Sequence, residues 1–359
     1  MAEVTSHAVT RDISDVIAAQ VAAAYRGGEG DIASICLGGS GSRGAFGVDD
    51  QATVSLADHT GIVDYQPDEL TLRARAGTPI SEIEALLRQN NQCFAAEIPS
   101  PSTGSTLGGA IACGWDGPGR AFAGALRDIV LGCQLVNGRG ETVRFGGQVM
   151  KNVAGFDLAR LQVGALGTLG AMLDVTLRLQ PRPECTKSVV FDVSPIEIGE
   201  WWQRTRTLRP LLSGTCYLER RLHLRFSGRE LAVNDVLKRI GGEVSALDWH
   251  ALRDLKTEFF HGERLACAYL PRYSSLPLTA GQALVEWEGA RVWVRNGDHL
   301  TLARDVTELG GFVRVMRGQM VSTRGITPAW HRALKSALDP KGVFNPVHFE
   351  RCFTGEGFA

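Results

Sequence analysis

The stretch LGGSGSRGAFG, residues 37–47, is nearly half glycine and follows a short apolar run. Gly39, Gly41 and Gly44 have the G-x-G-x-x-G spacing of dinucleotide-binding folds, in which glycines let backbone N–H groups approach a pyrophosphate. A Rossmann fold would need an amphipathic helix directly after the third glycine. The alternating pattern over residues 53–57 predicts a second strand instead. The stretch therefore predicts a strand–loop–strand unit, whose loop is either a nucleotide-binding nest or a plain turn.

Two further glycine-rich segments follow, PSPSTGSTLGGAIACG (residues 99–114) and GALGTLG (residues 164–170). Ser105 or Thr106 can cap a helix over residues 107–113. The small residues of that helix let a large ligand lie against the backbone, or they allow tight helix–sheet packing. The apolar run over residues 169–179 predicts a strand that a Pro-x-Pro sequence ends. Three glycine-dense turns, each beside an apolar segment, favour a shared ligand site.

Length and composition limit the class of protein. A chain of 359 residues predicts two domains, and 44% hydrophobic with 21% charged residues is typical of a globular protein. A net charge of -1 without a basic run disfavours nucleic acid as a partner. The cysteines form no CxxC pair, which predicts no iron–sulfur cluster in this chain. The sequence shows neither a signal peptide nor a transmembrane segment, so we expect a cytoplasmic protein.

After Pro183 the sequence alternates between strand-like and helix-like segments, which predicts an α+β cap domain of mainly antiparallel sheet. From Trp330 onward it reads as a helix and a tail. In RNGDHL, Asp298 is predicted to be the N-cap of the following helix. The histidines occur singly and are predicted to be surface or structural residues; they include His223, His250, His261 and His331.

The order of GGSGSRG, AGTPISEIEALL, STLGGAIACG, GALRDIVLG, GALGTLG and ALDPKGVFNP resembles the vanillyl-alcohol oxidase or PCMH-type FAD-binding superfamily. Within it, RFGGQVMKNVAGFDLARL and the overall length are most similar to the FAD-binding subunits of bacterial glycolate oxidases. The resemblance implies an α+β fold with a PCMH-type FAD-binding domain of two α+β subdomains over residues 1–183. It further implies a ferredoxin-like α+β cap over residues 184–329 and a C-terminal segment, 330–359, that returns to the FAD domain.

The resemblance also implies FAD, with the first loop wrapped around its pyrophosphate. That loop has neither histidine nor cysteine, so we expect noncovalent binding. The residues implied along the cofactor are Gly39, Ser40, Gly41, Ser42, Arg43, Thr106, Gly108, Gly109, Gly124, Asp128, Gly167, Thr168 and Gly170. Lys151, in the family-specific motif, is either a cation near the flavin N1 or an ordinary salt-bridge partner. No catalytic residue and no metal ligand is assigned.

In function, the resemblance implies a subunit of a complex that oxidises glycolate or another small 2-hydroxy acid. A second flavin-binding subunit would carry the hydroxy-acid site, and an iron–sulfur subunit would pass electrons onward, in the cytoplasm or at the inner membrane through the complex. Related D-2-hydroxyacid dehydrogenases have metal-binding histidines in an H-x-x-G-D-G-N-x-H pattern, which this chain lacks. We therefore expect a relaying or supporting role. The alternatives are a self-sufficient FAD-dependent D-2-hydroxyacid dehydrogenase and a non-catalytic scaffold.

Overall fold

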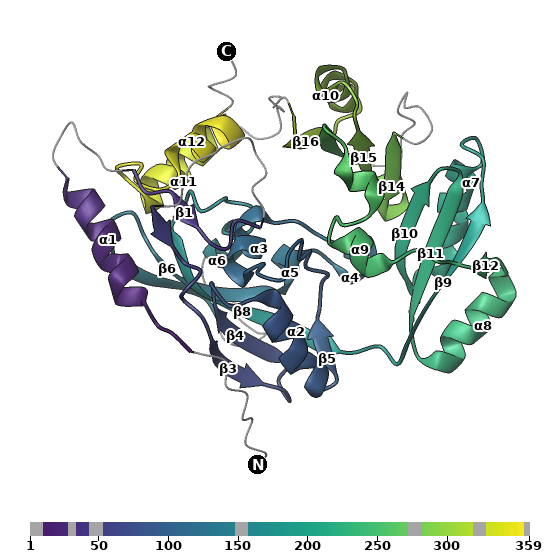
Figure 1. The fold of residues 1–359 in the computed structure, drawn as a ribbon, viewed down its shortest axis with the longest axis horizontal. Coiled ribbons are helices and arrows are strands. Elements are labelled where there is room, and N and C mark those ends of the chain that lie inside the picture. The colour runs from purple at the N-terminus through teal and green to yellow at the C-terminus, as the bar shows by residue number, and fades with distance from the viewer. Residues whose placement is uncertain are drawn as a thin grey trace.

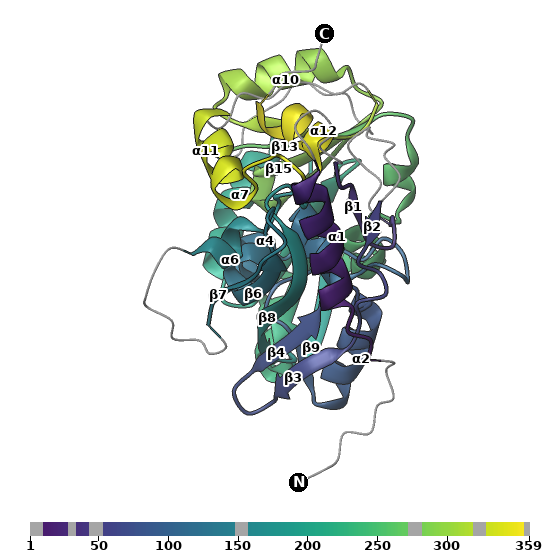
Figure 2. The same cartoon turned by 90° about the vertical axis from the view of Figure 1, so that its left-hand side faces the viewer.

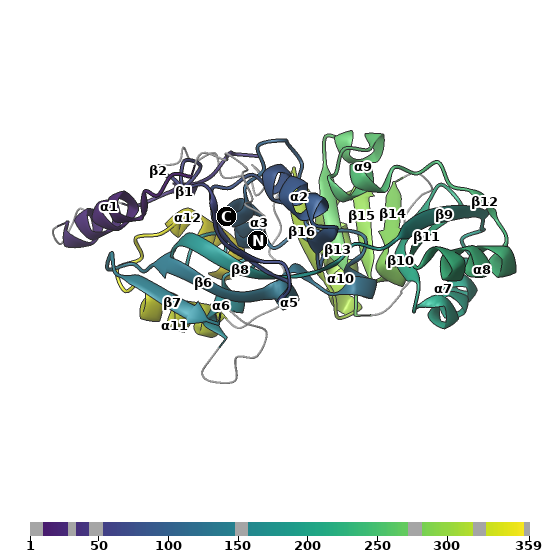
Figure 3. The ribbon, with the colours of Figure 1, turned by 90° about the horizontal axis from the view of Figure 1, so that it is seen from below.

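The computed structural model describes residues 10–27, 34–42, 53–147, 157–271, 282–318 and 328–354. In these ranges the chain forms two large β-sheets, one from its first half and one from its second half. The two sheets lie next to each other along the long axis of the molecule, and helices pack against both (Figure 1, Figure 3). This mixture of helices and sheets confirms the predicted α+β class.

The first sheet is organised around its longest strand, β8, which is buried along nearly its whole length. Its strands are, in spatial order, β3 (Ile62–Gln66), β4 (Thr71–Arg75), β8 (Ala171–Pro181), β6 (Val130–Val136) and β7 (Thr142–Gly146), with β5 (Gln92–Phe94) paired to the end of β8. The predicted strand over residues 169–179 is present, but it begins at Ala171 and continues to Pro181, which lies opposite Gln92.

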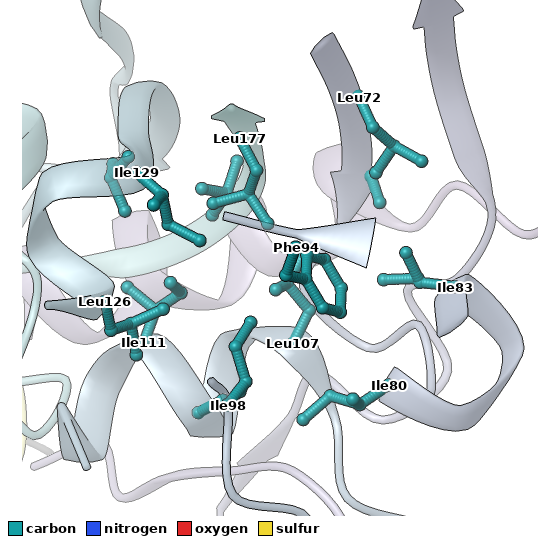
Figure 4. Close-up of a cluster of buried hydrophobic side chains, with 14 of the residues drawn as sticks. Leu72, Ile80, Ile83, Phe94, Ile98, Leu107, Ile111, Leu126, Ile129 and Leu177 are labelled. Carbon is teal, nitrogen blue, oxygen red and sulfur yellow. The ribbon is translucent and has the colours of Figure 1, made fainter. Parts of the chain in front are cut away.

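One face of this sheet is covered by short helices, and the main core of the first half lies between them. The helices are α2 (Ile80–Gln89), α3 (Leu107–Cys113), α5 (Leu126–Ile129) and α6 (Leu158–Leu161). Figure 4 shows side chains from α2, α3 and α5 meeting Phe94 of β5 and Leu177 of β8. In α2, Ile80, Ile83 and Leu87 are buried because their spacing places them on one side of the helix.

The glycine loop follows a very short strand. Strand β1 (Leu37–Gly38) pairs in parallel with β2 (Val54–Ser55), and β2 is the next element that the structure describes. The two strands of the predicted strand–loop–strand unit are therefore present, and residues 43–52 of the intervening loop lie outside the described part of the chain. Helix α1 (Ser14–Arg26) lies beside this pair (Figure 2).

The C-terminal segment packs against the first half of the chain. It contains α11 (Pro328–Leu338), α12 (Pro346–Phe349) and a π-helical turn (Glu350–Thr354). Between α11 and α12, Val343 and Phe344 are fully buried in a cluster with Ile17 of α1 and Leu173 of β8. The backbone of Ile35 hydrogen-bonds that of Val343, which fixes the approach to β1.

In the second sheet all neighbouring strands are antiparallel. The strands are, in spatial order, β12 (Glu243–Val244), β9 (Cys185–Asp192), β11 (Arg221–Gly228), β10 (Leu212–Leu218), β14 (Ala283–Glu286), β15 (Arg291–Arg295), β13 (Leu265–Tyr269) and β16 (Phe312–Arg317). This agrees with the mainly antiparallel sheet expected after Pro183.

Helices cover both faces of the second sheet. Side chains along each strand alternate between these faces, so both faces carry apolar side chains that pack against helices. The helices are α7 (Ile198–Thr205), α8 (Glu230–Ile240), α9 (Trp249–Arg253) and α10 (His299–Glu308), with 3₁₀ turns at Arg206–Leu208, Glu258–His261 and Trp287–Gly289. In β13, Ala266 packs with α10, whereas Cys267 packs with α9 on the opposite face. Asp298 caps α10 as predicted, accepting from Thr301 N at 3.3 Å.

Candidate cofactor site

A pocket lies between the loop after β1, the start of α3 and the turn that precedes β8. The predicted site residues that line it are Gly39, Thr106, Gly108, Gly109, Gly167 and Gly170. They come from the three glycine-rich segments, so the fold brings these segments together at one place. Across the described ranges, the residues that line the pocket are uncharged.

The other predicted site residues do not line this pocket. Ser40, Gly41 and Ser42 lie in the loop beside it, where Ser42 Oγ accepts a hydrogen bond from Ser105 Oγ at 3.0 Å. Thr168 is buried next to the pocket, and its hydroxyl donates to Ala165 O at 2.7 Å. Arg43 and Lys151 lie outside the residues that the structure describes.

Two of the lining glycines are required by close packing within the protein. A β-carbon at Gly108 would lie 2.7 Å from Ala76 Cβ, and Gly108 N donates to Ala76 O at 2.7 Å. A β-carbon at Gly39 would lie 2.9 Å from Thr106 Oγ1. That hydroxyl caps α3 by accepting from Gly109 N at 3.3 Å. The small residues of α3 therefore serve tight packing as well as the pocket.

Two other glycines are required by their backbone conformation. Gly41 has φ +69° with no atom of the described residues within 4 Å of an ideal β-carbon. Gly167 has φ +68°, and its β-carbon would lie 2.8 Å from Asn345 Nδ2. Residues with a side chain rarely adopt this left-handed backbone conformation, so both positions favour glycine.

Gly124 and Asp128 lie at the start of α5, away from the pocket lining. Asp128 Oδ2 accepts a hydrogen bond from Ala125 N at 3.0 Å and so caps that short helix. Beside it, Asp116 accepts from Leu126 N at 2.6 Å, and burial raises the pKa of its carboxyl. In this structure both carboxylates hold the chain at the end of the FAD domain that faces the cap.

The sequence analysis missed Asn345, which connects two walls of the pocket. Its Oδ1 accepts from Leu37 N at 2.7 Å, and its Nδ2 donates to Leu166 O at 2.6 Å. Asn345 itself has φ 42°, a left-handed conformation that asparagine tolerates better than most residues. The ALDPKGVFNP motif contains this residue, but nothing in the local pattern indicates partners at positions 37 and 166.

An ion pair between Lys335 of α11 and Asp339, just after that helix, holds the C-terminal segment in place. The Lys335 ammonium donates to Asp339 Oδ2 at 2.7 Å, Thr168 O at 2.8 Å and Phe344 O at 2.6 Å. Burial lowers the pKa of Lys335, and the Asp339 carboxylate opposes that change. Because Thr168 belongs to the turn of the pocket, this ion pair couples the turn to the segment that carries Asn345.

We expect Asn345→Ala to destabilise the protein by about 2–4 kcal/mol, because the Leu37 N–H and the Leu166 carbonyl would both lose a partner. Urea unfolding of the variant would measure this loss. Asn345→Asp can still accept from Leu37 N, but it would place a buried carboxylate oxygen against Leu166 O, so its loss should be at least as large as that of Asn345→Ala. Equal stability of wild type and Asn345→Ala would contradict the assigned connection.

The second sheet and its helices, which form the expected cap, contact the first half of the chain mainly through arginine side chains. Arg291 donates to Asp116 O at 2.5 Å, and Arg314 donates to the carbonyl of Cys113, the last residue of α3, at 3.2 Å. Arg225 also pairs with Glu97 at 2.5 Å, and Arg253 pairs with Glu84 at 2.8 Å, both between the two halves of the chain. The guanidinium groups are therefore used to join the two domains.

The residues of the pocket fit a flavin dinucleotide. The lining is rich in glycine and small residues and has no charged side chain in the described part of the chain, and Gly41, in the loop beside it, faces open space there. Gln162 lines the pocket with a buried side-chain Nε2 that has no hydrogen-bond partner. A cofactor with acceptor atoms would satisfy that group.

The sequence is similar to known FAD-binding proteins. Residues 11–146 match the family of the FAD binding domain. The chain is 37% identical to glycolate oxidase subunit GlcE of Escherichia coli (strain K12) over 309 residues, which cover 82% of this chain and 86% of that protein. It is also 34% identical over 130 residues to glycolate oxidase subunit GlcD of Bacillus subtilis (strain 168), which cover 36% of this chain and 27% of that protein.

Among solved structures, alkyldihydroxyacetonephosphate synthase has the same fold, with a TM-score of 0.62 at 16% identity, covering 92% of this chain and 75% of that one. At this identity the likeness concerns the fold alone. The match to subunit GlcE, in contrast, is at 37% identity and covers 82% of this chain. The chain therefore belongs to the glycolate oxidase subunit GlcE family of FAD-binding proteins.

Proposed function

We propose that this chain is the FAD-binding subunit of a complex that oxidises glycolate or a similar 2-hydroxy acid, and that it relays electrons without oxidising the acid itself. Bound FAD supplies a two-electron acceptor. The residues of the pocket hold the cofactor, and the cap closes over the far end of α3. The observation that carries the proposal is that Arg225, Arg253 and Arg291 of the cap are bound to groups of the FAD domain.

A site for a 2-hydroxy acid needs a cation for the carboxylate and a base for the hydroxyl proton. Arg225, Arg253 and Arg291, which face the FAD domain, are bound to its carboxylates or carbonyls. Arg291 is also paired with Glu286 at 2.7 Å, and both side chains are fully buried. These three guanidinium groups are therefore bound to groups of the protein itself.

Three of the described histidines, His59, His223 and His299, have structural surroundings. His223 is half-buried and contacts Ser245 Oγ at 2.7 Å, and burial lowers its pKa to about 4. His59 is buried, and its Nδ1 accepts from Ile13 N at 3.1 Å. His299 follows the N-cap of α10 and is 2% exposed. None of these three presents a base to the pocket lining.

The proposal predicts that glycolate or D-lactate, added without oxygen, leaves the flavin of the isolated chain oxidised. The absorbance of oxidised flavin near 450 nm is the measurement, with dithionite as the positive control for reduction. Bleaching by substrate alone would instead identify a self-sufficient dehydrogenase. A purified chain that is colourless and takes up no added FAD would favour the scaffold alternative.

As partners we propose a second flavin-binding subunit, which would carry the hydroxy-acid site, and an iron–sulfur subunit. The relative from Escherichia coli is itself described as a subunit, and the chain also matches part of a second glycolate oxidase subunit, GlcD. An iron–sulfur cluster would lie in another chain, because this sequence has no CxxC pair. Within the described residues, none of the helices is long and apolar enough to cross a membrane. We place the complex in the cytoplasm or at the inner membrane.

A further inference from the structure

Gln162 lies at the end of α6, on the turn that leads to Gly167. The residue is 2% exposed and lines the pocket, and its Nε2 is buried with no hydrogen-bond partner. Buried polar groups in native proteins almost always have a partner, because an unpaired donor loses its hydrogen bonds to water without replacement. An unpaired amide at this place therefore indicates a partner that enters the pocket.

The other polar side chains of the pocket are already used within the protein. Thr106 Oγ1 accepts from Gly109 N at 3.3 Å, and both ends of the Asn345 amide are bound, to Leu37 and to Leu166. Among the described lining residues, Gln162 is thus the one whose side-chain nitrogen is buried without a partner, whereas the Thr106 hydroxyl already has one partner and can still donate its own proton.

Hydrogen bonds fix the backbone on both sides of Gln162 in the sequence. Asp157 caps α6 by accepting from Arg160 N at 3.1 Å, and Gln162 O accepts from Ala165 N at 3.2 Å. Two residues on, Gly164 N donates to Ile111 O of α3 at 2.9 Å. Because this turn is fixed, the amide is already positioned before a ligand arrives, which reduces the entropy lost on binding.

We propose that Gln162 is a cofactor-positioning residue whose carboxamide N–H donates a hydrogen bond to an acceptor atom of FAD. This inference rests on the proposed function, because it requires FAD in this pocket. Phosphate oxygens, flavin carbonyls and ring nitrogens are all acceptors of the required kind. A carboxylate in place of the amide would offer acceptors only, so Gln162→Glu tests the direction of the hydrogen bond.

Gln162→Met is the main test, because it keeps the length of the side chain and removes its polar end. In the FAD-free protein we expect the melting temperature to rise by about 1–2 °C, since an unpaired buried donor is removed. In FAD titrations followed by flavin fluorescence we expect Kd to increase about tenfold, because the cofactor acceptor loses its partner. A residue with a merely structural role would not give these opposite effects.

The control is Thr257→Val in the cap, where Oγ1 is also buried without a partner but is not part of the pocket lining. This variant should melt at or above the wild-type temperature and bind FAD with a Kd within about twofold of wild type. An unchanged Kd in Gln162→Met, or a lower melting temperature of its FAD-free form, would overturn the inference.

Gln162→Glu provides a second variant if the methionine variant does not fold. It should bind FAD at least as weakly as Gln162→Met, and wild-type affinity in the glutamate variant would overturn the assigned donor. Wild-type protein that binds no FAD would reject the proposed function as well. Wild-type protein that binds FAD tightly, with both variants unchanged, would reject only the role of Gln162.

Discussion

Gly39→Val is expected to abolish the retention of FAD. The new β-carbon would lie 2.9 Å from Thr106 Oγ1, and the valine methyl groups would extend further into a pocket that Gly39 lines. Displacing Thr106 also removes the cap of α3. We expect FAD affinity to fall by a factor on the order of 100, about 2.7 kcal/mol. The flavin-to-protein absorbance ratio of the purified variant measures the loss.

The matched control is Gly104→Ala, where the added β-carbon would lie 3.7 Å from Ser40 Cβ, an ordinary contact. This variant should keep its flavin. Circular dichroism of both FAD-free proteins separates a damaged pocket from a damaged fold, since Gly39→Val should retain its secondary structure. Stoichiometric flavin in Gly39→Val would show that the loop does not contact the cofactor.

The glycine segments were sufficient to predict where the pocket is, but not why each glycine is there. Local patterns identify positions that favour glycine: a β-carbon would meet another segment at Gly39 and Gly167, and a left-handed φ favours glycine at Gly41 and Gly167. The atom that excludes it comes from another segment, such as Asn345 for Gly167 and Ala76 for Gly108. The alternative reading of tight packing was therefore correct for Gly108, which also lines the pocket.

Asn345 and Gln162 show what a single sequence cannot indicate. Asn345 binds Leu37, which is 308 residues away, and no local pattern encodes a contact over that distance. Gln162 reads as a polar residue at the end of a short helix, and its importance depends on burial and on the absence of a partner. Both are properties of the folded chain.

The order of the strands in the cap is likewise not indicated by the sequence. Alternating residues predicted its strands and amphipathic spacing predicted its helices, and Asp298 was identified as a cap from its neighbours alone. The order of the strands depends on pairing between distant segments. Strand β14, for example, lies between β10 and β15, and this brings Arg291 and Glu286 together where the cap meets Asp116.

Lys335→Met is expected to cause the largest loss of stability, about 3–5 kcal/mol, because it leaves the buried Asp339 carboxylate without its cation. Asp339 also accepts hydrogen bonds from Val343 N and Phe344 N, so the segment before α12 would lose its anchor. Urea unfolding of the FAD-free protein measures the change. Lys341→Met is the control: its ammonium is exposed and donates to Tyr25 O, and its loss should stay below about 1 kcal/mol.

The same variant connects stability to cofactor binding. Lys335 donates to the carbonyl of Thr168, next to Gly167, and it holds the segment that carries Asn345. When this support is lost, the turn and the loop after β1 should both move, so the FAD dissociation rate should rise in Lys335→Met and stay unchanged in Lys341→Met. A variant that is destabilised as expected but releases FAD at the wild-type rate would show that the C-terminal segment stabilises the fold without shaping the pocket.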